Sequence, residues 1–143
     1  MDGSVAGVYL PDQRTRWSRP VMMWRVPAGF PSPAEDYVEG RIDLNRDLVK
    51  HPLTTFYIRV DGDSMVGAGI FPGTLLVVDR GVTASEGDIV VARLGDELCV
   101  KRLSLEGGMV RLLSENEIYP PIEIPEGMDF EVWGRVMYSI QRH

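Results

Sequence analysis

Several residues that support particular chemistries are scarce in this chain of 143 residues. Its single cysteine, Cys99, excludes a disulfide within the chain and suits a reducing compartment, so we expect a cytoplasmic protein. With one cysteine and only His51 and His143 as histidines, we expect no zinc site of the usual composition and no cofactor. No apolar run approaches the roughly 18 residues of a membrane span and no signal-peptide core is recognisable, so no membrane association is expected.

Positive charge is also scarce, because 15 basic residues face 21 acidic ones and the net charge is −6. Nucleic-acid-binding surfaces normally carry clustered positive charge, so we expect no strong direct DNA binding. A DNA-associated role would then come through a protein partner. Lysine is scarcer still and occurs only at Lys50 and Lys101. Because arginine does not release its proton at any useful pH, a catalytic amine has to be one of these two.

From residue 54 onward the chain contains short segments rich in β-branched and aromatic residues. These segments are 54–60, 74–78, 88–94, 97–103, 109–113 and 129–140, separated by turns that contain Gly, Asp or Pro. The pattern predicts a mostly β domain, folded as a compact, highly bent antiparallel sheet or partial barrel. One or two short helices precede it, the first beginning at Ser32 with Pro33 at the first helical position, and the second near 44–50.

Residues 1–28 have a different character and are expected to form a flexible N-terminal arm. Glycines and prolines interrupt every periodic pattern there, and an excess of arginine makes the segment slightly basic. The arm is too short for a helix-turn-helix, and a disordered tail without a function is the alternative. Prolines then flank Ala28-Gly29, the smallest dipeptide of the region. They favour the extended backbone that a protease groove accepts.

Ser64 stands at the end of the strand predicted at 54–60, after the turn sequence Asp61-Gly62-Asp63. Nucleophiles often stand at such a position, although most turns of this composition are only turns. A serine nucleophile needs a nearby base. His51, at a predicted helix end, and His143, the last residue, are poor candidates for a Ser-His-Asp triad. The other solution is a serine–lysine dyad with a neutral lysine.

Lys101 fits that requirement on the strand predicted at 97–103. Side chains alternate between the two faces of a strand, so Lys101 shares one face with Cys99 and Leu103. Between these apolar neighbours burial would lower the pKa of its amine. The alternative is an ordinary lysine whose ammonium group reaches solvent. Lys50 at a helix C-terminus is explained by the helix dipole and by solvation.

Four ordered sequence blocks resemble a known family. The blocks are Gly-Asp-Ser-Met at 62–65, Gly-Thr-Leu-Leu-Val-Val-Asp at 73–79, Gly-Asp-Ile-Val-Val-Ala at 87–92 and Val-Lys-Arg-Leu at 100–103. Together they resemble the LexA/UmuD family of self-cleaving serine–lysine peptidases. Residues 28–39 and 41–45 are similar to the cleavage region of its UmuD branch, and the resemblance runs from about residue 26 to the C-terminus.

The resemblance implies a role for each matching residue. Ser64 would be the nucleophile, Lys101 the general base, and Ala28-Gly29 the scissile bond. The backbone amides of Ser64 and Asp63 would form the oxyanion hole. Self-cleavage would divide the chain into an arm, 1–28, and a peptidase-like domain, 29–143, with the fold of the LexA/UmuD C-terminal domain. UmuD members commonly have Cys-Gly at the cleavage site, whereas Ala-Gly is the LexA-type pair.

The resemblance also implies partners. The expected protein is a homodimer that cuts itself when stimulated by a RecA filament on single-stranded DNA. It then joins a UmuC-like Y-family polymerase for error-prone translesion synthesis in the SOS response. Two alternatives remain, a LexA-like or prophage regulator core that lacks a DNA-binding domain, and a non-enzymatic polymerase-binding module. A signal peptidase, which also uses a Ser–Lys dyad, is disfavoured by the missing membrane anchor.

Overall fold

The computed structural model describes residues 2–14, 18–22 and 38–143. Ala28, Gly29 and the helix predicted to begin at Ser32 lie outside the described residues. The chain forms two compact units, one made of residues up to Pro11 together with 51–143 and one made of 12–50. Within the described part of the chain, no helix is long and apolar enough to cross a membrane.

The smaller unit contains strands β2 (Ser18–Met22) and β3 (Val38–Asp43), which pair antiparallel, and the single-turn helix α1 (Leu44–Leu48). Asp43 caps this helix, since its side chain accepts a hydrogen bond from the Asn45 amide at 3.1 Å. The helix predicted near 44–50 is therefore confirmed, although it ends earlier than predicted. Neither β2 nor β3 was predicted, because Pro20 and Gly40 interrupt the alternating pattern of a strand.

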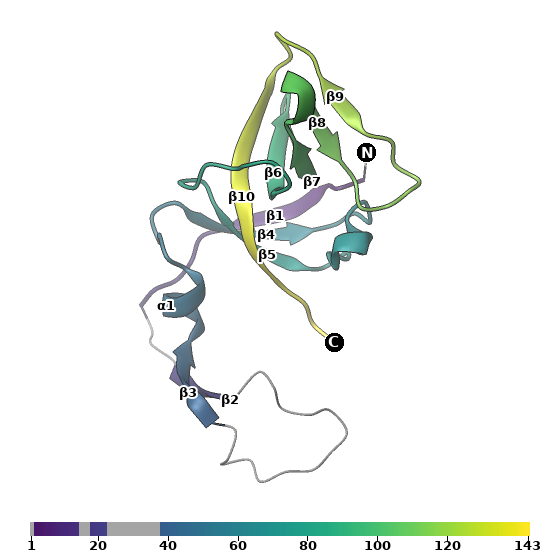
Figure 1. The fold of residues 1–143 in the computed structure, drawn as a ribbon. Helices are drawn as coiled ribbons and strands as arrows, with labels where there is room; N and C mark the ends of the chain where they lie inside the picture. The colour runs from purple at the N-terminus through teal and green to yellow at the C-terminus, as the bar shows by residue number, and fades with distance from the viewer. Residues whose placement is uncertain (1, 15–17, 23–37) are drawn as a thin grey trace. The chain divides into compact units, whose positions relative to one another are not determined.

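The larger unit is a single curled antiparallel sheet of eight strands (Figure 1). In spatial order these strands are β1 (Val5–Tyr9), β4 (Thr55–Val60), β5 (Leu75–Asp79), β10 (Phe130–Ile140), β6 (Ile89–Leu94), β7 (Glu97–Ser104), β8 (Val110–Leu113) and β9 (Ile122–Ile124). Two 3₁₀ turns, Val66–Ala68 and Glu106–Gly108, are the helical segments described in this unit. The predicted mostly β, highly bent sheet is confirmed.

Strand β10 bends the sheet because it pairs with β6 through its first half and with β5 through its second half. The register shifts once between Val132 and Gly134 and again between Val136 and Tyr138. Each shift marks a bulge, and bulges bend a strand and increase its twist. At Gly134 a Cβ atom would lie 2.6 Å from Val78 Cγ1, so the bend needs a residue without a side chain.

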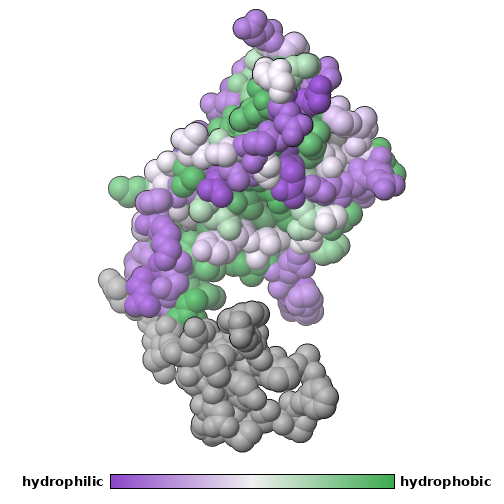
Figure 2. All heavy atoms as spheres, in the orientation of Figure 1, coloured by the Kyte–Doolittle hydropathy of each residue, from purple (hydrophilic) through white to green (hydrophobic). Residues whose placement is uncertain are grey.

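Strands β6 and β7 are buried on both faces, because the curled sheet forms two apolar clusters. Val91 and Val100 belong to one cluster, and Val90, Cys99 and their neighbours belong to the other. These alternating residues confirm the two faces predicted for the segment 97–103. In Figure 2 hydrophilic side chains are spread over the visible face of this unit, with hydrophobic ones in smaller patches between them.

Strand β1 was not foreseen in the segment expected to be a flexible arm. It pairs antiparallel with β4, with Val5 opposite Val60 and Tyr9 opposite Tyr57. Its glycine and alanine, together with an N-terminal position, hide the alternating pattern in the sequence. Pairing with an existing sheet edge supplies the hydrogen bonds that such a segment would not make alone.

Candidate functional site

Ser64 follows β4 on the turn predicted from the sequence and is fully buried, with 0% of its surface exposed. Its backbone is fixed, since the Ser64 carbonyl accepts a hydrogen bond from the Glu115 amide at 2.8 Å. Its hydroxyl has no hydrogen-bond partner among the described residues. Buried hydroxyls are usually paired, so an unpaired one at the end of a rigid strand is a candidate reactive group.

Lys101 lies in the middle of β7 with 1% of its surface exposed. The alternative that it reaches solvent is therefore wrong. Its Nζ donates a hydrogen bond to the Ser114 hydroxyl at 2.8 Å. Burial lowers the pKa of the amine, and the electrostatic influence of Cys99, Asp2 and Asp63 acts in the opposite direction without cancelling the effect. Apolar surroundings and a neutral hydrogen-bond partner therefore favour the uncharged form of the Lys101 amine.

The loop after β8 connects the serine turn to the lysine strand. Ser114 accepts the hydrogen bond from Lys101, and the next residue, Glu115, donates its amide to the Ser64 carbonyl. Because Ser114 and Glu115 are consecutive, Ser64 and Lys101 are anchored to the same short stretch of backbone. Nothing in the sequence singles out Ser114, since its relation to Lys101 depends on the pairing of β7 with β8.

The same loop holds Asp63, which precedes Ser64. Asn116 Nδ2 donates to the Asp63 carbonyl at 3.0 Å, and the Tyr119 hydroxyl donates to Asp63 Oδ1 at 2.6 Å. The hydrogen bond to the Asp63 carboxylate raises the pKa of Tyr119 to about 12. Tyr119 also lies beside the lysine, with its ring centroid 5.5 Å from Lys101 Nζ. The loop thus holds both the backbone and the side chain of Asp63.

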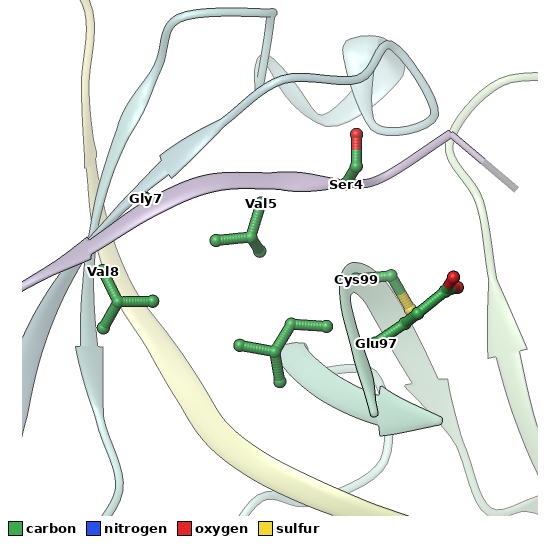
Figure 3. A pocket seen from close by; sticks show the side chains of 7 residues that line it. Ser4, Val5, Gly7, Val8, Glu97 and Cys99 are labelled. Atoms are coloured by element: carbon green, nitrogen blue, oxygen red, sulfur yellow. The ribbon is translucent and has the colours of Figure 1, made fainter. Parts of the chain in front are cut away.

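Residues 2–4 lie between the serine turn and β7, and the space that they fill is the groove beside Ser64. Their carbonyls accept three backbone hydrogen bonds, from Ser64 to Asp2 at 3.0 Å, from Val100 to Gly3 at 2.9 Å and from Asp61 to Ser4 at 2.9 Å. Figure 3 shows this segment passing Cys99, with which Ser4 forms an isolated antiparallel bridge. The Ser64 amide, predicted as part of the oxyanion hole, therefore already binds a peptide carbonyl.

Glycine is required where this segment and the site approach each other. A Cβ atom on Gly3 would lie 2.8 Å from Ser64 Oγ and 2.7 Å from the Val100 carbonyl oxygen. These two distances place the serine hydroxyl beside the residue that precedes Lys101. A Cβ atom on Gly62 would overlap the Asp2 carbonyl oxygen. The backbone of residues 2–4 is thus in direct contact with the serine turn.

The histidine considered as a base pairs elsewhere. His51 Nδ1 lies 2.5 Å from Asp79 Oδ2, at the end of β5, and the Thr54 hydroxyl donates to the other oxygen of this carboxylate at 2.7 Å. No contact among the described residues joins His51 or His143 to Ser64. Ser64 and Lys101 are anchored to the same loop, but no direct hydrogen bond joins them among the described residues, because the Lys101 amine bonds to Ser114 and the Ser64 hydroxyl is unpaired. The Ser64 amide binds a carbonyl oxygen, as an oxyanion-hole donor would.

The chain is similar in sequence to one protein family and to several individual proteins. Residues 20–137 match the family described as Peptidase S24-like. Protein MucA of Salmonella typhimurium is 42% identical over 127 residues, which cover 88% of this chain and 86% of MucA. Protein ImpA of the same organism is 49% identical over 87 residues, or 61% of this chain and 60% of ImpA. The LexA repressor of Dechloromonas aromatica is 41% identical over 133 residues, which cover 92% of this chain and 64% of the repressor.

Proposed function

The chain belongs to the peptidase S24-like family, among the UmuD-like members of the LexA/UmuD group, and from this premise we propose that it is a self-cleaving accessory subunit of an error-prone DNA polymerase. Self-cleavage at Ala28-Gly29 would convert it to the form that acts in SOS mutagenesis. The observation that carries the proposal is the buried Lys101, whose pKa is lowered by burial and whose amine is held by a hydroxyl on the loop that also anchors Ser64.

In the proposed reaction, the neutral Lys101 amine takes the proton of the Ser64 hydroxyl while Ser64 Oγ attacks the carbonyl carbon of Ala28. Backbone amides at Ser64 and Asp63 would stabilise the negative charge that develops on the carbonyl oxygen. The C–N bond to Gly29 then breaks, and the lysine ammonium group gives its proton to the leaving amine. Water, deprotonated by the same lysine, hydrolyses the Ala28–Ser64 ester and frees both parts.

The same proposal implies a cytoplasmic location and a set of partners. A RecA filament on single-stranded DNA would stimulate the cut, and a homodimer of the product, residues 29–143, would bind a UmuC-like Y-family polymerase. The net charge of −6 supports contacts through proteins rather than direct DNA binding.

The experiment is incubation of the purified chain with RecA, ATP and single-stranded DNA, followed by intact-mass measurement. We expect two fragments whose masses correspond to residues 1–28 and 29–143. Controls omit the DNA or replace Ser64 by alanine. A chain that stays uncut with active filaments would favour a non-enzymatic binding module, and cleavage at another bond would contradict the assignment of Ala28-Gly29.

A regulator core of the LexA type is the second candidate, favoured by the 41% identity to a LexA repressor. The two candidates differ in what the product binds. The polymerase subunit should be recovered with a Y-family polymerase after cleavage, whereas the regulator should change the occupancy of a promoter in the cell. Measurement of both in one strain separates them.

A further inference from the structure

The groove beside Ser64 is lined on both sides by backbone groups that pair with an extended chain. One wall is the serine turn, with donors at Asp61 and Ser64, and the other is β7, with a donor at Val100. In this structure all three donors bind carbonyls of residues 2–4. The groove is therefore a site for an added strand, and it is occupied by the chain itself.

Residues 2–4 meet the requirements that a substrate strand has to meet. The Asp2 carbonyl accepts the hydrogen bond of the Ser64 amide, where an oxyanion would form. Gly3 presents a bare Cα to the serine hydroxyl, just as a small residue at a cleavage site would. A second strand cannot take the same donors at the same time, so substrate binding and this contact exclude each other.

The contact can be broken without loss of the sheet. Residues 5–9 are tied to β4 by the pairing of β1, whereas the described hydrogen bonding to β7 is confined to Gly3 and the bridge at Ser4. Beyond that bridge β1 and β7 are separated by a different cavity, a pocket of about 550 Å³ whose lining includes Val5, Val8 and Leu98 (Figure 3). Residues 2–4 can thus leave Ser64 while β1 stays in place.

We propose that residues 2–4 of the chain occupy the groove beside Ser64 reversibly, and that the cleavage segment enters this groove only after they leave. The groove then accepts an extended backbone that has glycine or another small residue opposite Ser64. The consequence for cleavage rests on the proposed function, whereas the occupancy does not. The rate of self-cleavage is reduced by the fraction of molecules in which the groove is filled.

The first test measures occupancy without cleavage, in the full chain with Ser64→Ala. Gly3→Val brings side-chain atoms against the Val100 carbonyl, whereas Ala6→Leu adds the same number of carbons at an exposed position. Hydrogen exchange at the Val100 and Asp61 amides should accelerate at least about tenfold in Gly3→Val, the factor expected for one net hydrogen bond, and not in Ala6→Leu. Equal exchange in all three proteins would overturn the occupancy.

The second test measures cleavage with Ser64 intact. Gly3→Val should cleave at Ala28-Gly29 faster than the parent and Ala6→Leu at the parental rate, and an added peptide of residues 2–9 should slow Gly3→Val. A variant that lacks residues 2–4 serves the same purpose if Gly3→Val disturbs folding. A cut at Asp2-Gly3 would overturn the proposal, because the segment would then be a substrate. If no protein is cut, the proposed function fails, and the exchange measurement still decides the occupancy.

Discussion

Lys101 and Asp79 are both buried ionisable residues at strands of the same sheet, and their surroundings are opposite. Asp79 lies at the end of β5 with 3% of its surface exposed. Burial acts to raise the pKa of this carboxyl, but hydrogen bonds from Thr54, His51 and the Gly81 amide lower it below the ordinary value. Lys101 has one neutral hydroxyl as its hydrogen-bond partner among the described residues, so burial determines the direction in which its pKa shifts.

The two residues show how a buried charge that stabilises the fold differs from a buried group that can act as a base. A buried carboxylate with three hydrogen-bond donors is satisfied as an anion and stabilises the strand end. A buried amine without a carboxylate partner is satisfied best when it is neutral, and a neutral amine is a base. Burial by itself therefore does not identify a catalytic residue. The hydrogen-bond partners of the buried ionisable group make the distinction.

The largest expected effect distinguishes the two residues by activity. Lys101→Met should lower cleavage at Ala28-Gly29 by at least about 10³-fold, as should Ser64→Ala, because each removes one half of the proposed dyad. Intact-mass measurement over time gives the rates. Lys50→Met is the matched control, since it removes the other lysine, which is exposed, and it should cleave normally. Undiminished cleavage in Lys101→Met would refute the role of base.

The second effect is the pH dependence of cleavage. A lysine acts as a base when it is neutral, so the rate should rise about tenfold per pH unit below the pKa of Lys101 and level off above it. Because burial lowers that pKa, the plateau should begin below the ordinary lysine value of about 10.4. The rate of self-cleavage without RecA, measured from neutral pH to about pH 10, tests this. A flat profile would contradict the assignment.

The third effect concerns stability, where the order of the two residues is reversed. Asp79→Asn should lower the free energy of unfolding by about 1–3 kcal/mol, because hydrogen-bond donors lose a charged acceptor. Lys101→Met should raise it by about 1 kcal/mol at neutral pH, because an apolar side chain replaces a buried amine. Urea denaturation in the uncleaved Ser64→Ala background measures both. A destabilised Lys101→Met would show that the lysine is structural.

The same pair predicts that stability rises with pH in two separate ranges, an acidic one set by Asp79 and an alkaline one set by Lys101. The lowered pKa of Asp79 means that its contribution is present above the unfolded value of about 3.9 and is lost as the pH falls through the lower folded value. The lowered pKa of Lys101 means that stability rises with pH between its folded value and about 10.4. Each dependence should disappear in the corresponding variant.

The smallest effect tests the positioning of the lysine. Ser114→Ala removes the hydroxyl that accepts the hydrogen bond from Lys101 Nζ, and it should slow cleavage by about tenfold, the factor for the loss of one well-placed hydrogen bond. The pH at which the rate levels off should move as well, which a purely structural role would not cause. Ser114→Thr keeps the hydroxyl and should restore most of the activity. No change in either quantity would exclude a positioning role.

Much of the larger unit could be predicted because its strands are strongly patterned and bounded by clear turns. The strands from 54 onward other than β9 and the two faces of β7 were predicted correctly, as was the helix near 44–50 in the smaller unit. β1, β2, β3 and β9 were not predicted. These strands are short or contain glycine or proline, and all four lie at sheet edges. Such strands depend on a partner rather than on their own sequence.

The sequence by itself determined the β architecture, the position of Ser64 on a turn and the two lysines among which an amine base had to be found. Turn chemistry and side-chain alternation act between near neighbours, so they are readable along the chain. Only the tertiary structure decided that Ser114 holds Lys101 and that residues 2–4 fill the groove beside Ser64. Those contacts join segments far apart in sequence, and the curl of the sheet brings them together.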